Sequence, residues 1–363
     1  MNSFEVEPPT VPLGPAVVVG RLNIRRFEEA DGKAWDEFVW QHPHASPFHL
    51  TAWKRTIEES FGYGPVYLLA EEAGRIRSIL PLFLIRNAFL KRALISTPFA
   101  VYGGILADSP FAQEELYRYA VQLGREMGVE YIELRNAHRE QCRNGPNLDR
   151  YVAFSQALYC PEDELLGSLP KKTRNMVRKA IKQPFEMHSG IRDTKVFDRI
   201  HSRNMRRLGT PNFPRRYFDR LLANFGPMAD IREVRLNHKV MAVSLNLYFR
   251  GDMHTYHAAA DTRYNSLGPN TFMYFDHLRW AAANGYKSFD FGRCKRGTGV
   301  FEFKKHWNTT MKELPYEIVL IKANSLPNFS PANPRFHLAI RIWQRLPLFV
   351  TRAVSRFVFP LFP

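Results

Sequence analysis

The sequence has few cysteines, no long apolar run and few acidic residues in its second half. Its three cysteines lie too far apart for a zinc or redox pair, and an odd number does not suit a disulfide framework. No apolar run approaches the ~18 residues of a membrane span. The first 20 residues are acidic and broken by proline, unlike a secretory signal. We expect a cytoplasmic chain without a metal site, able to meet the inner face of a membrane as a peripheral protein.

Length and charge indicate the number of domains and the kind of partner. A chain of 363 residues that is 45% hydrophobic can bury a large core and suggests two domains. Residues 1–160 carry 17 Lys and Arg against 19 Asp and Glu, whereas residues 161–363 carry 34 against 16. The sequence therefore predicts an anionic partner that meets the second half of the chain.

The two halves resemble each other. Residues 35–65 align with residues 197–227, with matching aromatic residues, a matching proline and a matching Phe-Gly. Two strands around a short turn follow each segment, and then a helix (111–127 or 270–284) and one more strand. Four features in one order indicate an internal repeat. Each half is therefore predicted to fold as a helix, antiparallel strands, a helix and a strand.

The second copy resembles the core of the Gcn5-related acyltransferase fold. Its strand 253–260, loop, helix and strand 287–291 follow the order of that core. The loop "SLGPN" contains Gly268 and Asn270, which could offer backbone N–H groups and a helix cap to the phosphates of a donor. It lacks the Gln/Arg-x-x-Gly-x-Gly/Ala pattern of coenzyme A users, so an ordinary helix-capping turn is an equal alternative.

Three motifs extend this resemblance to a family. "SLPKKTRNMVRKAIK", "FDFGRCKRGTGVFEFKKHW" (289–307) and "NPRFHLAIRIWQRLP" resemble the FemAB family, in particular its branch associated with exopolysaccharide PEP-CTERM/exosortase systems. The resemblance spans about residues 25–350. It implies an α/β (α+β) chain with two tandem Gcn5-related N-acyltransferase domains, each a mixed central sheet flanked by helices. It also implies an N-acyltransferase that uses acyl-CoA or aminoacyl-tRNA. One departure is Trp307-Asn308, where the family has Trp-Gly.

The 289–307 segment carries the candidate chemistry. Acyl transfer to an amine needs a proton acceptor and positive charge near the developing oxyanion. Asp290 alternates with two phenylalanines, so it is predicted to face away from them as a base or an amine-holding carboxylate. The resemblance gives Lys304 the oxyanion role. The alternatives are an ordinary ion pair for Asp290 and a solvated charge at a strand edge for Lys304.

Other residues in and near this segment are weaker candidates. Tyr256 and His257 could take part in catalysis, although packing roles are more common for such residues. The Gly-Thr-Gly run lacks the spacing of a phosphate loop and is more often a structural turn. The predicted substrate-binding residues of the segment are Arg293, Lys295, Arg296, Gly297, Thr298, Gly299, Phe303 and Trp307.

A basic helix is predicted over residues 170–183, with Ser168 as its cap. Thr173, Met176, Val177, Ala180 and Ile181 share one face. The rest of the helix carries six positive charges and no acid, which favours contact with the phosphates of a sugar nucleotide, a lipid diphosphate or tRNA over a plain solubility face. The candidate contacts are Lys171, Lys172, Arg174 and Arg178.

The tail 330–363 has five arginines and no acid among many apolar residues. We predict two amphipathic helices split at Pro347, which either lie on a membrane surface or pack over the second domain. The predicted domains are a flexible N-terminus (1–20), a first acyltransferase-like domain (21–160), a second with the basic helix (161–322), and the tail (323–363).

Three functions remain open from the sequence. The first is an N-acyltransferase that acts on an amino sugar or a lipid-linked precursor in exopolysaccharide or cell-envelope assembly. The second is an aminoacyl-tRNA-dependent transferase of the peptidoglycan-bridge type, in which the basic half holds the tRNA. The third is a non-catalytic module at the membrane surface. In the first domain, Glu133 stands where Asp290 stands in the second, without the glycines or the Phe-Lys, so that domain is predicted to be structural or acceptor-binding.

Overall fold

The computed structural model describes residues 17–19, 22–87, 91–142, 147–148, 151–158, 161–326 and 337–359. Most of the predicted N-terminal segment 1–20, Cys160 and the start of the tail lie outside the described residues. The chain divides into two compact units. The first comprises Met1–Asp149, Leu314–Asn328 and Pro360–Pro363, and the second comprises Arg150–Glu313 and Phe329–Phe359.

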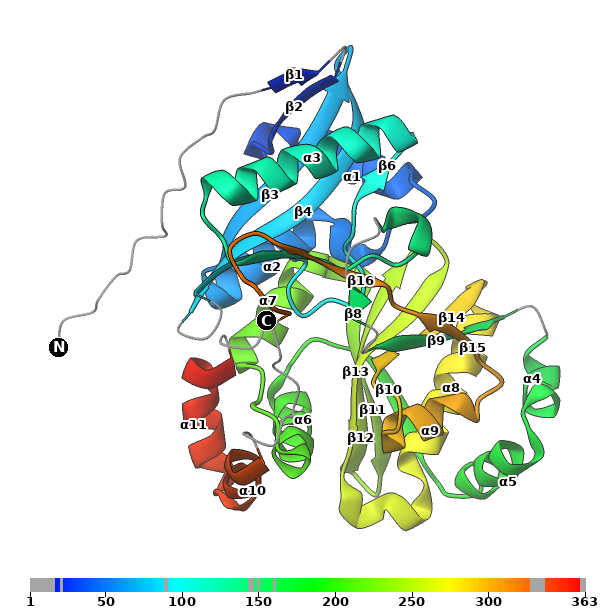
Figure 1. Cartoon of the computed structure of the whole chain (residues 1–363). Coiled ribbons are helices and arrows are strands. Elements are labelled where there is room, and N and C mark those ends of the chain that lie inside the picture. The colour runs from blue at the N-terminus through cyan, green and yellow to red at the C-terminus, as the bar shows by residue number, and fades with distance from the viewer. Residues whose placement is uncertain are drawn as a thin grey trace. The chain divides into compact units, whose positions relative to one another are not determined.

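The first unit is a mixed sheet with helices (Figure 1). Its strands are antiparallel except for one parallel pair, β5 with β7. The strand order is β1 (Val17–Val19), β2 (Leu22–Arg26), β3 (Gly64–Glu72), β4 (Arg75–Asn87), β5 (Lys91–Ser96), β7 (Tyr131–Leu134), β16 (Tyr316–Leu320) and β8 (Asn147–Leu148), with β6 (Leu106–Ala107) beside β4. The helices are α1 (Gly32–Gln41), α2 (Thr51–Phe61) and α3 (Pro110–Glu126).

The second unit repeats this plan. Its strand order is β10 (Glu186–Ile191), β11 (Ala229–Leu236), β12 (Lys239–Phe249), β13 (Asp252–Ala260), β14 (Ser288–Cys294), β9 (Val152–Ala157) and β15 (Thr310–Glu313). Among the described strands of this sheet, β13 and β14 pair in parallel and the other pairs are antiparallel. The helices are α4 (Glu162–Ser168), α5 (Lys171–Ala180), α6 (Lys195–Leu208), α7 (Arg215–Phe225), α8 (Pro269–Ala283), α9 (Gly299–Lys305), α10 (His337–Arg345) and α11 (Leu348–Val358).

The predicted fold class is confirmed, because each unit has a mixed central sheet flanked by helices. In each unit two helices precede an antiparallel hairpin, and a long helix leads into the second strand of the parallel pair. The unit boundaries differ from the predicted ones at 160 and 322. β9 lies before residue 160 but pairs with β14 of the second sheet. β16 lies between residues 160 and 322 but pairs with β7 of the first sheet.

The core of the second unit forms where α8 covers the sheet. Met273 and Leu278 of α8 pack in one buried cluster with Phe289 and Phe291 of β14. Burial of apolar side chains of this size contributes roughly 1.5–3 kcal/mol each. The helices α6 and α7 pack on the strands β11 to β13. This scaffold fixes the strands that carry the candidate site.

Three local predictions need correction. Residues 299–305 form a helix, not part of a strand, because Phe301 and Lys304 are buried three residues apart and Thr298 caps the first turn. Ser168 ends α4, where its hydroxyl donates to Leu165 O, instead of capping the basic helix. Asn270 lies within the first turn of α8, since Gly268 occupies the cap position.

The departure from Trp-Gly at residue 308 has a conformational explanation. Asn308 has a φ of 56°, in the left-handed region that glycine adopts without strain. Asparagine is among the residues that best tolerate this region. The turn therefore keeps the backbone conformation that a glycine would allow.

Candidate functional site

The candidate site lies where β13 and β14 part. The two strands pair in parallel only from Asp252 and Ser288 to His254 and Asp290. β13 then continues to Ala260 and β14 to Cys294 without pairing to each other. Such a gap leaves main-chain groups of both strands available to a ligand.

Both parting strands carry an extra residue at this point. On β12, Leu245 and Asn246 pair with His257 and Thr255, so Tyr256 is an insertion in β13. The pairing of β14 with β9 shifts between Asp290 and Arg293. Bulges of this kind bend a strand and are common next to active sites. They direct both strands away from each other here.

Lys304 closes the gap from the side of α9. Its Nζ donates to Gly292 O at 2.9 Å and to Arg293 O at 3.2 Å, and the residue is only 4% exposed. Burial lowers its pKa from 10.5 to about 8, so the ammonium form still outnumbers the amine by roughly ten to one at pH 7. An ammonium group has three N–H donors, and these contacts use two.

Gly292 allows the close approach of these groups. It has a φ of 73°, and a Cβ at this position would lie 3.4 Å from Thr255 O and 3.8 Å from Lys304 Nζ. A side chain would therefore enter the space beside the ammonium group. The glycine keeps that space open in a conformation that other residues rarely adopt.

Asp290 is held by the backbone and by a histidine. Its carboxylate accepts from Gly292 N at 2.6 Å and lies 3.1 Å from His254 Nδ1. Burial lowers the pKa of His254, but the hydrogen bond and the charge of Asp290 outweigh that effect and raise the pKa above its usual value. The Nε2 atom of His254 is buried and has no hydrogen-bond partner among the described residues. The pair can therefore hold or transfer a proton.

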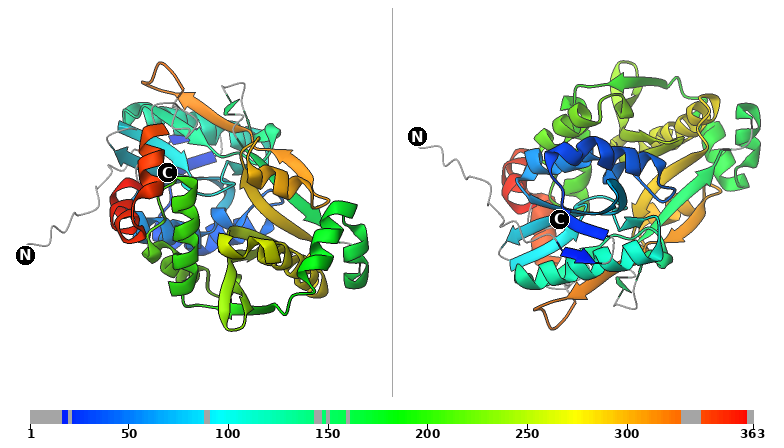
Figure 2. Two further views of the ribbon diagram at one scale, coloured as in Figure 1. Left: turned by 90° about the horizontal axis from the view of Figure 1, so that it is seen from below. Right: turned by 90° about the horizontal axis from the view of Figure 1, so that it is seen from above.

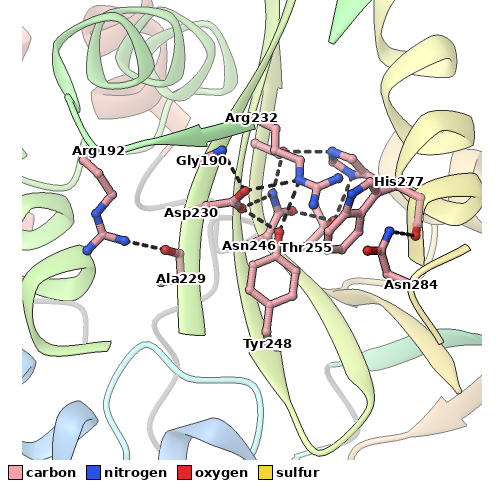
Figure 3. Close-up of polar contacts among 12 residues, drawn as sticks. Gly190, Arg192, Ala229, Asp230, Arg232, Asn246, Tyr248, Thr255, His277 and Asn284 are labelled. Carbon is pink, nitrogen blue, oxygen red and sulfur yellow. Dashed lines mark hydrogen bonds and ion pairs between the residues drawn. The ribbon is translucent and has the colours of Figure 1, made fainter. Parts of the chain in front are cut away.

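A buried polar network supports β13 behind the site (Figure 3). Thr255 Oγ1 donates to Asn246 Oδ1 at 3.0 Å, and Asn246 Nδ2 donates to Asp230 Oδ1 at 3.2 Å. Arg232 Nε lies 3.3 Å from Asp230 Oδ2, and its guanidinium stacks on Trp280 at 3.7 Å. Because each polar group fixes the next, the network restricts the position of Thr255.

Tyr256 is the inserted residue of β13, and His257 follows it directly. His257 is half-buried among aromatic rings, with Phe213 at 4.9 Å and His201 at 5.0 Å, and desolvation of its ring lowers its pKa well below the usual value. Tyr256 shares a 2.7 Å hydrogen bond with the hydroxyl of Tyr217. The structure thus gives His257 a neutral packing position.

The loop after β14 is a capped turn. Thr298 accepts from Phe301 N and donates to Lys295 O, Gly297 has a φ of 72°, and Gly299 begins α9. The basic side chains nearby have protein partners. Arg293 and Lys295 lie over the ring of Tyr151, and Arg296 pairs with Glu313.

The aromatic candidates of this segment face the core. Trp307 is 1% exposed and packs 5.6 Å from Phe303 and 6.1 Å from Phe291. Phe303 is partly buried against the same cluster. Trp307 therefore packs in the core of the second unit, and its contact with a substrate stays a prediction.

The basic helix is present as α5 and lies beside α8. Its buried residues are Thr173, Val177 and Ala180, whereas Met176 and Ile181 of the predicted apolar face are exposed. The exposed basic residues are Lys171, Lys172, Arg178, Lys179 and Lys182. Arg174 is half-buried, and its guanidinium donates to Gly167 O. A Cβ at Gly268, in the turn before α8, would lie 3.3 Å from Ala180 Cβ. The basic helix and the N-terminus of α8 are therefore neighbours.

The first unit has a different arrangement at its own parallel pair. Beyond β7, Arg135 is 3% exposed and donates to Thr97 O at 3.1 Å and Ala100 O at 3.4 Å. Its guanidinium also lies 5.9 Å from the ring of Tyr316. At the end of this strand the first unit therefore has a buried arginine held by backbone carbonyl oxygens.

Replacing Glu133 tests this difference. Its carboxylate accepts from Arg135 Nε at 2.9 Å, and Arg135 keeps its carbonyl partners without it. We expect Glu133→Ala to leave the rate of acyl transfer within about twofold of wild type, because the effect is confined to local stability. Loss of turnover in a folded variant would assign the chemistry to the first unit instead.

Comparison with known proteins identifies the chemistry. Residues 171–305 match the acetyltransferase (GNAT) domain model, and this range includes β13, β14 and Lys304. The chain is an N-acyltransferase with a GNAT-type domain over these residues. No curated protein sequence matches the acyltransferase. A GNAT domain uses an acyl-coenzyme A-type donor in general. Among the described residues, no group of three or more His, Cys, Asp or Glu is placed to hold a metal ion.

Solved structures extend the likeness to both units of the acyltransferase. The structure of FemX is 13% identical with a TM-score of 0.64, and the match covers 87% of this chain and 99% of FemX. A tandem GNAT protein from the clavulanic acid biosynthesis pathway is 9% identical with a TM-score of 0.54, over 84% of this chain and 100% of that one. At such low identities these matches show a shared tandem fold.

A third structure with this fold is the C-terminal domain of a putative lysylphosphatidylglycerol synthetase from Agrobacterium fabrum. It is 11% identical with a TM-score of 0.53, and the match covers 80% of this chain and 92% of that domain. Within the described part of the acyltransferase, no helix has the length and apolar content needed to cross a membrane.

The sequence did not reveal His254 as the partner of Asp290. His254 and Asp290 are paired residues on neighbouring parallel strands, a relation that depends on strand register. The available signal was a polar residue in each predicted strand, His254 at the second position of 253–260 and Asp290 at the fourth position of 287–291. The sequence did not reveal Thr255 and Gly292 either, because their positions in the site also depend on strand register.

Proposed function

We propose that this chain transfers an acyl or aminoacyl group to an amine on an amino sugar or a lipid-linked precursor, at the parting of β13 and β14. One observation carries the proposal: a buried ammonium group, Lys304 Nζ, is held there by Gly292 O and Arg293 O with one N–H left for a ligand. Assignment to exopolysaccharide or cell-envelope assembly rests on the FemAB-like sequence motifs.

In the proposed reaction, Lys304 stabilises the oxyanion and the Asp290–His254 pair transfers the proton. The acceptor amine attacks the carbonyl carbon of the donor, and the developing oxyanion receives the third N–H of Lys304. The amine gives up its proton to the Asp290–His254 pair. Collapse of the intermediate breaks the thioester or ester bond, and the pair returns the proton to the leaving thiolate or hydroxyl oxygen. Asp290 also positions the Gly292 turn, since it accepts from Gly292 N.

The pH dependence follows from the lowered pKa of Lys304. The ammonium form is present below its pKa of about 8 and is lost above it, so we expect kcat to fall as the pH rises from about 7 to 9. Measuring kcat across this range with saturating substrates tests the assignment. Lys304→Arg serves as the control, because its residual rate should not fall in this range. A wild-type rate that stays constant to about pH 9 would contradict the role of Lys304.

Two donor classes are supported by different observations. The GNAT domain favours an acyl-coenzyme A, with the turn at Gly268 and the N-terminus of α8 as the phosphate site. The exposed basic helix α5 beside that terminus favours aminoacyl-tRNA as the second candidate, as does the likeness to FemX. Each basic side chain that meets an RNA phosphate would add to the salt dependence of binding.

The deciding experiment offers each donor separately. Purified protein is incubated with radiolabelled acetyl-coenzyme A or with charged aminoacyl-tRNA, each with a mixture of amino-sugar acceptors, and Lys304→Ala is run beside it. Transfer from the thioester that the variant loses would establish a coenzyme A-dependent sugar N-acyltransferase. Transfer from tRNA alone would establish the aminoacyl reaction. Equal transfer by wild type and Lys304→Ala would reject the proposed site for either donor.

A further inference from the structure

The C-terminal helices α10 and α11 attach to α6 by one face. They lie along α6 in Figures 1 and 2. On the inner face, Ser355 Oγ accepts from Asn212 N at 2.9 Å, and Arg352 pairs with the buried Asp198. Gln344 Nε2 donates to Arg207 O at 3.0 Å. These contacts fix the orientation of both helices, so their outer face is also defined.

The outer face is apolar and exposed. It carries Leu338, Ile342, Phe349 and Phe357, whose exposed fractions are 70%, 52%, 75% and 67%. Single exposed apolar residues are common, but four large ones on two consecutive helices are not. Among the described residues of the second unit, none covers these four side chains. We call this surface, with the arginines described next, the tail face.

Arginines surround these apolar residues. Arg341, Arg345 and Arg356 lie on the two helices, and residues 330–363 contain no acid. On α6, the exposed Arg199, Arg203 and Arg207 follow at intervals of four residues. Side chains at this spacing share one side of a helix. The tail face therefore combines apolar rings with positive charge that no acid of the tail offsets.

A basic pocket opens beside the first turn of α11. It has a volume of about 420 Å³, and its lining includes Leu348, Arg203, Arg206, Arg207 and Arg263. Its one acid, Asp261, already pairs with Arg263 at 2.6 Å and lies 3.8 Å from Arg203. The remaining positive charge suits a phosphate group.

We propose that the tail face binds a bilayer surface that contains anionic phospholipid. Phe349, Phe357, Leu338 and Ile342 enter the boundary between headgroups and acyl chains, while the arginines contact headgroup phosphates. The arginines are complementary in charge to anionic headgroups, whereas a protein partner for four apolar side chains would not need this excess of arginine. The inference does not depend on the acyl-transfer reaction, because it concerns a different surface of the second unit.

Vesicle co-sedimentation of the full chain tests the proposal. Sucrose-loaded vesicles of phosphatidylcholine alone are compared with vesicles that hold about three parts phosphatidylcholine to one part phosphatidylglycerol. The variant is Phe349→Asp with Phe357→Asp, which changes only exposed side chains. The matched control is Phe111→Asp, another exposed phenylalanine, on α3 of the first unit. Circular dichroism checks that each variant is folded.

We expect wild type and Phe111→Asp to bind the anionic vesicles and the double variant to lose at least about tenfold in affinity. Binding should weaken as salt rises from about 0.1 M to 0.5 M, because the arginine contacts are screened. Failure of wild type to bind, or equal binding by the folded double variant, would overturn the proposal. A concentration-dependent dimer that the double variant abolishes would assign the face to a second copy of the chain instead.

Discussion

Lys304→Ala should lower the rate of acyl transfer by about 100- to 1000-fold, the effect typical of removing one preorganised oxyanion donor. The ammonium group is buried and held by two carbonyl oxygens, so no solvent-exposed cation can take its place without rearrangement. The loss should appear mainly in kcat, because the charge acts on the transition state more than on bound substrate. Steady-state kinetics with the donor that the transfer assay selects measures it.

The neighbouring lysine provides the control. Lys305 is exposed and follows Lys304 directly on α9. Lys305→Ala removes the same charge from the chain but not from the gap between the strands, and its rate should stay within about twofold of wild type. If both variants lost activity equally, the effect would come from the net charge of the helix. If Lys304→Ala kept more than about a third of the rate, the oxyanion assignment would be wrong.

Asp230→Ala should destabilise the second unit by about 3–5 kcal/mol, because it leaves Arg232 buried without its counter-ion. The Arg232 side chain is 1% exposed and lies against Trp280, so water cannot solvate the guanidinium unless the sheet opens. Asp230 also accepts from Tyr248 and Asn246, and these donors would lose a partner too. Urea denaturation followed by circular dichroism gives the free energy of unfolding.

An exposed ion pair of the same unit is the reference. Arg296 and Glu313 are about half exposed, so Glu313→Ala should cost no more than about 1 kcal/mol. Asp230→Asn keeps an acceptor for Tyr248 and provides a milder variant if Asp230→Ala does not fold. A loss below about 1 kcal/mol for both Asp230 variants would mean that water reaches Arg232 in the folded state.

The strands and helices were predictable where the hydrophobic pattern was long. The hairpin turns at Ala73-Gly74 and Asn237-His238 have positive φ angles, as such tight turns require. Phe289 and Phe291 lie in the core and Asp290 pairs with His254, in agreement with the alternation along the strand. In these segments local propensity and burial favour the same structure.

Short patterns and partners distant in sequence were not predictable. Residues 301–304 alternate between apolar and charged, like a strand, but four residues do not distinguish a period of 2 from a helical one. The helix forms because Thr298 caps it and because burial selects Phe301 and Lys304. The contact of Lys304 with the carbonyl oxygens of β14 depends on that helix. The sequence motif identified the residue, and only the fold supplied its partners.

The positions of β9 and β16 have a consequence for the ancestry of the two units. β9 comes from the first half of the sequence but lies in the sheet of the second unit. β16 comes from the second half but lies in the sheet of the first unit. A gene divided near residue 160 would encode two polypeptides that each lack a strand and expose the edge of a neighbouring one. A duplication in which each half depends on a strand of the other is expected to be kept as a pair.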